Sequence, residues 1–287
     1  MNKLHTTAKY LLFSGMLAGA YTLGTHQHLN WAELREKLQQ QSDCLQITHK
    51  HSIVQSELFT PVQEQFHANK ASLGSLLSAA GTVCFIGDSV TAGSENGGYP
   101  WYKPLANAFP ELKTFKLAAG GATSKSLLEM SREHLPACDV YIFALGTNDV
   151  RYRDAQRGAT TKEEYIGNLS GIVKRARELN AAAQFVFISP WCSIPEDPIP
   201  PISREQKEQL MSEYAEALNQ YCTAEGFLYI NPNEILSILI KHPVLRQHYL
   251  KDHIHPMHPD GCYLYSAAVW EEGNKTYPPV SEKPAGR

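Results

Sequence analysis

The chain has 287 residues, of which 43% are hydrophobic and 19% are charged, and this composition suits one sizeable globular domain with extensions. The formal net charge is -3, whereas nucleic-acid-binding proteins carry a basic patch, so we expect no nucleic-acid partner. The chain contains no fixed-period repeat and no long low-complexity tract, which excludes solenoid and fibrous classes.

Residues 1–24 have the pattern of an export signal. Lys3 and Lys9 precede an apolar run at 10–24 that is about as long as a secretory segment and short for a membrane span. The lysines lie on the N-terminal side, which favours export of the remaining chain. We therefore expect a signal peptide or an uncleaved signal anchor. In either case the protein is expected in the periplasm or outside the cell, with membrane contact only through this segment.

The region at 25–80 is expected to be an N-terminal extension that ends with a small helix at 75–81. From residue 82 onward, short apolar runs alternate with helical patterns. Continuous apolar runs are typical of parallel strands that are covered on both faces. The expected strands are Thr82–Ile86, Leu112–Leu117, Val140–Leu145, Gln184–Ser189 and Phe227–Ile230.

Two of the intervening helices have clear start signals. Thr161-x-x-Glu164 is a capping box followed by apolar residues at helical spacing, and Ser203-x-x-Gln206 is another, whose helix ends at Gly226. Alternating strands and helices predict right-handed β-α-β units and a three-layer α/β/α sandwich with a central parallel five-stranded sheet. We place this domain at 81–271 and expect a disordered tail at 272–287.

Ligands of such sheets bind beyond the carboxyl ends of the strands. Gly87-Asp88-Ser89 follows one expected strand, and the Gly-Thr-Asn-Asp stretch that ends at Asp149 follows another. The proline-rich segment at 192–203 also follows a strand, cannot form regular structure, and is expected to border the same site.

Residues that suit acyl transfer are gathered in these segments. A serine nucleophile needs a base, a carboxylate that orients the base, and hydrogen-bond donors for the developing oxyanion. Ser89 can be the nucleophile, and His255 can be the base with Asp252 three residues before it. Asn148 offers a side-chain amide, and Gly121 can present an unobstructed backbone N–H.

In this order, "FIGDSVTAG", "AAGGATS", "ALGTNDVR" and "DHIHP" resemble the four sequence blocks of the SGNH (GDSL) hydrolases, over roughly residues 82–270. The resemblance implies a flavodoxin-like fold and an esterase that needs no cofactor. It also implies that Ser89 is the nucleophile and donates its backbone N–H to the oxyanion, with Gly121 and Asn148 as the other donors. Asp252 and His255 then complete the triad. Like that family, the chain lacks a Gly-x-Ser-x-Gly elbow.

A metal site is the main alternative for the residues around the predicted base. Imidazoles and a carboxylate are ordinary zinc ligands, and four of them are close in sequence: Asp252, His253, His255 and His258. We favour a site without metal, in which His253 and His258 are partly exposed loop side chains. A metal centre would leave Ser89 and Asn148 without a role.

Two further groups of residues allow two interpretations each. Tyr99, Trp101 and Tyr102 could stack on a sugar or hold an acyl chain, although packing against the core is the commoner role of such residues. Arg151 and Arg153 could hold an anionic group of the substrate or pair with neighbouring aspartates.

The six cysteines are scattered, without a Cys-x-x-Cys pair, so a zinc ribbon is not indicated. Cys84 in an apolar strand and Cys222 on an apolar helix face are expected to be buried thiols. The sequence does not decide whether any of the other four cysteines form a disulfide.

These features predict an exported serine esterase that hydrolyses carboxylic esters of acylated small molecules or glycans. Location and family resemblance point to O-acetyl groups on a cell-envelope or capsular polysaccharide as the substrate. One alternative is an O-acyltransferase that uses the same triad with a sugar acceptor. Another is a membrane-tethered glycan-binding or assembly factor. The sequence leaves the oligomeric state open.

Overall fold

The computed structural model describes residues 72–151, 160–194 and 203–275. The expected export signal at 1–24, most of the extension, Arg153 and most of the proline-rich segment lie outside these ranges. None of the helices within the ranges is both long enough and apolar enough to cross a membrane.

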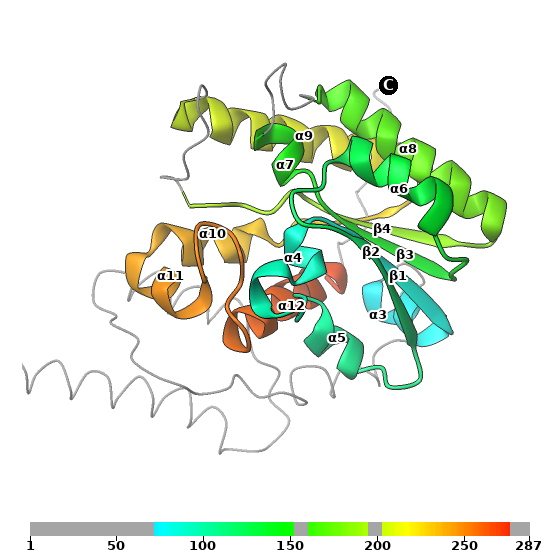
Figure 1. Cartoon of the computed structure of the whole chain (residues 1–287), viewed down its shortest axis with the longest axis horizontal. Helices are drawn as coiled ribbons and strands as arrows, with labels where there is room; N and C mark the ends of the chain where they lie inside the picture. The colour runs from blue at the N-terminus through cyan, green and yellow to red at the C-terminus, as the bar shows by residue number, and fades with distance from the viewer. Residues whose placement is uncertain (1–71, 152–159, 195–202, 276–287) are drawn as a thin grey trace, which may run out of the picture.

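A five-stranded, all-parallel sheet forms the centre of the domain, with the strand order β2-β1-β3-β4-β5 (Figure 1). This is the order of the flavodoxin-like doubly wound fold. Every strand overlaps one of the apolar runs in the sequence. The strands are β1 (Thr82–Gly87), β2 (Lys113–Ala118), β3 (Val140–Ala144), β4 (Gln184–Ile188) and β5 (Leu228–Ile230).

One face of the sheet is covered by three long helices, α6 (Ser124–His134), α8 (Lys162–Leu179) and α9 (Arg204–Glu225) (Figure 1). The predicted capping boxes are confirmed, because Thr161 caps α8, Ser203 caps α9, and Gly226 ends α9 in the left-handed conformation. The helices bury their apolar sides against alternate strand residues such as Ile86 and Phe143.

The opposite face is covered by more helices, most of them short. They are α3 (Leu73–Ala79), α4 (Ser89–Ala92), α5 (Lys103–Asn107), α10 (Asn233–Lys241), α11 (Pro243–Tyr249) and α12 (Asp260–Gly273). Their core contains the other strand residues, including Phe85, together with Trp101 and Trp191. Helices on both faces of the parallel sheet confirm the predicted three-layer α/β/α sandwich (Figure 1).

Two short helices lie at the carboxyl ends of the strands. The 3-10 helix η2 (Ser94–Asn96) follows α4, and α7 (Thr147–Arg151) follows β3. The helix α7 contains Asn148, which the sequence placed at the site, whereas the sequence assigned no role to η2.

The packed unit extends beyond both expected boundaries of the domain. Leu73 and Leu77 of α3 are buried in the core, before the expected start at 81. At the other end α12 continues to Gly273, and the side chain of Asn274 accepts a hydrogen bond from the backbone N–H of Gly74 at 2.9 Å. The two ends of the unit are therefore joined, and the residues directly after 271 are ordered by these contacts.

The described cysteines are free thiols, and Cys84 and Cys222 are buried as expected. Cys138, Cys192 and Cys262 are also unbridged. The described cysteines therefore form no disulfide with one another. Cys44 lies outside the described ranges.

Candidate active site

Ser89 is the first residue of α4, directly beyond the end of β1. Asp88 caps this helix and accepts a hydrogen bond from the Val90 N–H at 3.0 Å. At Gly87 a Cβ atom would lie 2.5 Å from the Ala144 carbonyl oxygen of β3, so the tight turn requires glycine. The turn places Ser89 between β1 and β3, where the strand order reverses and ligands of such sheets bind.

His255 connects Ser89 to Asp252 through two short hydrogen bonds. Its Nε2 atom lies 2.7 Å from Ser89 Oγ, and its Nδ1 atom lies 2.7 Å from Asp252 Oδ2. With the proton on Nδ1, the imidazole donates to the carboxylate and its Nε2 atom can accept the serine proton. The structure thus brings together three residues that the sequence assigned to one site.

Asp252 is held as a carboxylate. Its Oδ1 atom accepts the backbone N–H groups of Ile254 and His255, each at 2.9 Å. Partial burial opposes ionisation, but the hydrogen bonds from His255 and Ile254 outweigh it, and the pKa of Asp252 falls well below its ordinary value. The group is therefore negative at neutral pH and can stabilise a positive charge on His255.

The backbone around the base is anchored by several elements. The segment between α11 and α12 contains an antiparallel bridge between Leu250 and Pro256. The Lys251 N–H donates to the His255 carbonyl at 2.8 Å, and the Tyr265 hydroxyl donates to the Ile254 carbonyl at 3.1 Å. These bonds fix the direction in which the His255 side chain leaves the backbone.

Three potential oxyanion donors lie at the ends of adjacent strands. The Ser89 N–H is at the first position of α4, where no carbonyl of the helix can accept it. Gly121 has a φ of 70° in a turn closed by the Ala122 N–H and the Ala119 carbonyl at 3.2 Å. Asn148 donates one amide hydrogen to the Ala122 carbonyl at 3.0 Å, which leaves the second amide hydrogen for a ligand.

Asp149 is a supporting residue whose role the sequence did not reveal. It is buried in α7, and its two carboxylate oxygens accept the Ser124 N–H, each at 3.0 Å, while Oδ1 also accepts the Ser124 hydroxyl at 2.6 Å. Burial raises the pKa of Asp149 to about 6, although the bonds from Ser124 oppose the shift. These contacts join α7 to the start of α6 and so hold Asn148 near the Gly121 turn.

Asp88 is a second buried carboxyl group beside the nucleophile. Its side chain is fully enclosed, and its Oδ2 atom has no hydrogen-bond partner. Burial raises the pKa of Asp88 to about 7, against the opposing effect of the hydrogen bond from Val90. The carboxylate that is bonded to His255 is that of Asp252, the residue that the sequence interpretation preferred to Asp88 as the acid.

The other histidines of the cluster face different neighbours. His253 Nε2 lies 2.9 Å from Arg151 Nη1, so this ring nitrogen accepts a hydrogen bond from the guanidinium. The His258 ring packs against Tyr99 at an interplanar angle of 38°, with ring centroids 3.9 Å apart. Within residues 72–151, 160–194 and 203–275, no group of three His, Cys, Asp or Glu side chains is arranged to hold a metal ion.

The aromatic residues after the nucleophile divide into core and surface. Trp101 and Tyr102 are buried, and Tyr102 stacks on Phe85 of β1 with ring centroids 3.7 Å apart. The packing role that the sequence favoured is therefore confirmed for these two residues. Tyr99 is half-buried beside His258.

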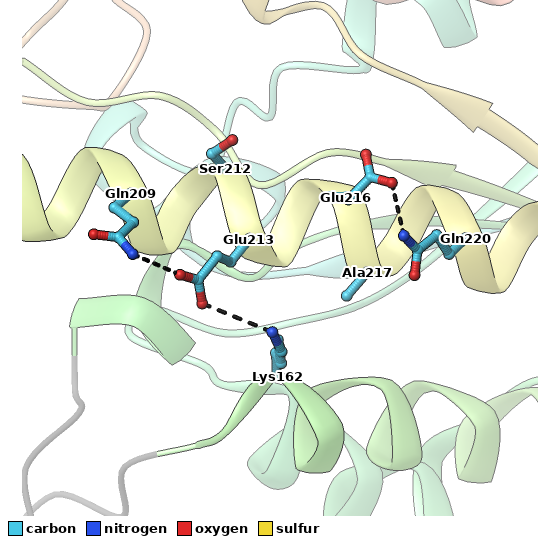
Figure 2. A pocket seen from close by; sticks show the side chains of 7 residues that line it. All are labelled: Lys162, Gln209, Ser212, Glu213, Glu216, Ala217 and Gln220. Atoms are coloured by element: carbon cyan, nitrogen blue, oxygen red, sulfur yellow. Dashed lines mark hydrogen bonds and ion pairs between the residues drawn. The ribbon is translucent and has the colours of Figure 1, made fainter.

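A surface groove of about 420 Å³ lies between α8 and α9 (Figure 2), and Ser89, Asp252 and His255 are not among the residues that line it. Its polar side chains bind one another. Lys162 Nζ lies 3.8 Å from Glu213 Oε2, Gln209 donates to Glu213 at 3.0 Å, and Gln220 donates to Glu216 at 2.7 Å. We assign no ligand to this groove.

The order and geometry of these segments correspond to a known family. The family model described as "GDSL-like Lipase/Acylhydrolase family" matches residues 85–258, which is more than half of the chain. The chain belongs to this family. It is therefore a GDSL-type ester hydrolase, and the resemblance seen in the four sequence blocks is confirmed.

Solved structures show the same fold. A putative GDSL-like lipase from Parabacteroides merdae has a TM-score of 0.54 at 19% identity, covering 67% of this chain and 94% of its own. A catalytic mutant of an acetylxylan esterase from Geobacillus stearothermophilus has a TM-score of 0.52 at 18% identity, covering 67% and 94%. A search of curated proteins returned no match. At these identities, the two structures show that this GDSL hydrolase shares their fold.

Proposed function

We propose that this GDSL hydrolase is an exported serine esterase that uses a Ser89-His255-Asp252 triad. The observation that carries the proposal is the unbroken hydrogen-bond chain from Ser89 Oγ through both imidazole nitrogens to Asp252, with 2.7 Å at each step. A chain of this kind activates a serine hydroxyl that is otherwise a weak nucleophile.

In the first half-reaction, Ser89 Oγ attacks the ester carbonyl while His255 Nε2 takes the hydroxyl proton. The resulting imidazolium donates its Nδ1 proton in a hydrogen bond to the ionised Asp252. His255 then returns its proton to the leaving alcohol as the C–O bond breaks, which leaves an acyl group on Ser89. In the second half-reaction, water attacks this acyl-enzyme with His255 again as the base, and the acid is released.

The tetrahedral intermediate carries a negative charge on the former carbonyl oxygen. The backbone N–H groups of Ser89 and Gly121 and the second amide hydrogen of Asn148 are the donors for this oxygen. In other acyl-transfer enzymes, removal of one such donor lowers kcat by about 100- to 1000-fold. Asn148 is kept in place by its bond to the Ala122 carbonyl, so it needs no reorganisation when the charge develops.

O-acetyl groups on a cell-envelope or capsular polysaccharide are the proposed substrate. The export pattern at 1–24 favours a substrate outside the cytoplasm. Structural neighbours include acetylxylan esterases, and two of them are catalytic mutants in which a serine and an aspartate were replaced by alanine. These two residue types are the nucleophile and the acid of the proposed triad.

The triad is tested with the purified full-length protein and p-nitrophenyl acetate. Ser89→Ala is expected to lower kcat by at least about 10^4-fold, because the nucleophile is lost, and to abolish labelling by a fluorophosphonate probe. Ser212→Ala, at an exposed position of α9, is the matched control and is expected to retain full activity. Retained turnover by Ser89→Ala with an unchanged circular dichroism spectrum would overturn the assignment.

The substrate and location need separate measurements. A panel of esters from acetyl to long acyl chains, together with acetylated polysaccharides, is expected to show preferred release of acetate. Cell fractionation is expected to find the protein outside the cytoplasm. Preference for long acyl chains, or a cytoplasmic location, would contradict the proposed substrate while leaving the triad intact.

A further inference from the structure

The loop that follows the nucleophile helix contacts the segment that carries the base. We call residues 93–99 the η2 loop, since they include the 3-10 helix η2 and begin where α4 ends at Gly93. The loop leaves the Ser89 turn and returns to the core at Pro100. Three of its residues contact residues on either side of His255.

The central contact is made by Asn96. Its Nδ2 atom donates a hydrogen bond to the carbonyl of Pro256, the residue directly after the base, and lies 3.7 Å from Cys262 Sγ of α12. The preceding residue of the loop, Glu95, makes a second contact. Lys251 Nζ donates to its carbonyl and lies 3.7 Å from its carboxylate.

The third contact is the tilted ring pair of Tyr99 and His258, with ring centroids 3.9 Å apart. The three contacts thus span the base segment from residue 251 to residue 258.

The carbonyl groups around the base show why Asn96 differs from the other anchors. Four consecutive carbonyls, from His253 to Pro256, each accept a hydrogen bond. The donors to the first three belong to the segment after β4, to α12 and to the base segment itself: Ile194 N–H at 2.9 Å, Tyr265 hydroxyl at 3.1 Å and Lys251 N–H at 2.8 Å. The donor to Pro256 comes from the nucleophile side of the site.

The Asn96 amide is itself held in position by the η2 loop. The Asn96 N–H donates to the Gly93 carbonyl at 3.0 Å, and the Asn96 carbonyl accepts the Tyr99 N–H at 3.1 Å. Because the backbone is fixed on both sides, the side chain can present its donor to Pro256 with little loss of entropy.

The two neighbouring contacts are weaker candidates for this role. Lys251 and Glu95 are about half exposed, at 49% and 46% of their side-chain surface, and exposed ion pairs contribute little. Tyr99 and His258 form a tilted ring contact between two side chains, three residues beyond the base. Asn96, by contrast, bonds to the backbone of the residue next to His255.

We propose that Asn96 is a positioning residue for the base: it fixes the His255 segment to the Ser89 turn and thereby sets the distance between His255 Nε2 and Ser89 Oγ. Asn96 touches neither substrate nor reacting atoms and acts through Pro256. The proposal rests on the proposed function for its kinetic consequences. Displacement of a catalytic group by about 1 Å can lower the rate about 100-fold.

The first test replaces Asn96 with alanine. Asn96→Ala is expected to lower kcat for p-nitrophenyl acetate by about 10- to 100-fold, with KM changed less than about twofold and fluorophosphonate labelling slowed in parallel. Asn107→Ala, at an exposed position of α5, is the matched control and is expected to behave as the parent protein. Unchanged kcat in Asn96→Ala, or equal changes in kcat and KM, would overturn the proposal.

The second test uses the pH dependence of a near-isosteric variant. In Asn96→Asp, an ionised carboxylate cannot donate to the Pro256 carbonyl, whereas the protonated form can. The ratio of the kcat of Asn96→Asp to that of the parent protein is therefore expected to rise as the pH falls from 8 to 5. A constant ratio over this range would mean that the loss does not depend on the donor, and would contradict the positioning role.

A third measurement separates this proposal from the proposed function. In the Ser89→Ala background no turnover is needed, and a crystal structure reports the distance between His255 Nε2 and the side chain of residue 89. Adding Asn96→Ala is expected to lengthen this distance by about 1 Å, while adding Asn107→Ala leaves it unchanged. An unaltered distance would refute the positioning role even if the esterase is confirmed. A protein that hydrolyses no ester would refute the esterase, and the distance would still report on Asn96.

Discussion

The two helical layers of the sandwich differ in how they are built. The layer of α6, α8 and α9 contains helices of 11, 18 and 22 residues, and each begins with a capping box. In the opposite layer, α3, α4, α5, α10 and α11 have only 4 to 9 residues, and α12 alone reaches 14. Long capped helices are specified by their own sequence, whereas short helices depend on tertiary packing.

The chemistry of the site is concentrated in the layer of short helices. Ser89 opens α4, while Asp252 and His255 lie between α11 and α12. The long-helix layer contributes the turn before α6 that contains Gly121. The molecule thus separates a locally specified scaffold from a site held by long-range contacts, and substitutions in the two layers should have different consequences.

The largest expected effect of this contrast concerns Asp252. Asp252→Asn is expected to lower kcat by about 10^3- to 10^4-fold, because the amide cannot stabilise the imidazolium and favours the wrong tautomer of His255. The free energy of unfolding should change much less. Steady-state kinetics together with urea unfolding check both expectations, and a variant with near-normal kcat would remove Asp252 from the triad.

An intermediate effect is expected for Asp88, in the same layer. Its pKa rises from 3.8 in the unfolded chain to about 7 in the folded state, so the folded state binds the proton more tightly and stability falls as the pH rises through this range. Asp88→Asn keeps an acceptor for the Val90 N–H but carries no charge. As the pH rises from 5 to 8, the variant should gain about 3 kcal/mol of stability relative to the parent protein.

Urea unfolding at several pH values measures this gain. The unfolding free energy of Asp88→Asn minus that of the parent protein should increase as the pH increases. Parallel curves for the two proteins would show that Asp88 does not change its charge in the folded state.

The smallest effect is expected in the layer of long helices. Ser203→Ala removes the side chain that accepts the Gln206 N–H at the start of α9, and loss of such a cap costs about 1 kcal/mol of stability. The kcat for p-nitrophenyl acetate should stay unchanged. Thermal unfolding and kinetics of this variant check the separation of the layers, and an altered kcat would mean that α9 is coupled to the site.

The same contrast explains what could be predicted from the sequence. The strands and the capping boxes at Thr161 and Ser203 depend on residues that are close in sequence. Local sequence patterns were therefore sufficient to predict them. The capping box of α6 was missed because its reciprocal residue is Ser126, where the expected pattern has Glu or Gln. The end of the domain was placed too early because the contact of Asn274 with Gly74 joins distant parts of the chain.

The candidate site was predictable where residue chemistry is distinctive, and not where a role arises from packing. Ser89, Asp252 and His255 come from motifs with recognisable chemistry, and the structure places them together. Asp149 follows Asn148 directly, but nothing in the sequence indicates that Ser124 would bind it. Asn96 belongs to a glycine-rich loop that resembles any turn, and its partner lies 160 residues away.

The bond between Ser89 and His255 joins residues 166 positions apart, and this separation has a consequence for the order of assembly. During synthesis all five strands and the nucleophile turn leave the ribosome before the base does. A chain that stops before residue 252 contains the complete sheet and Ser89, yet lacks His255, the proposed acceptor of the serine proton. If the proposed triad is correct, the last part of the domain to be synthesised determines when Ser89 becomes reactive.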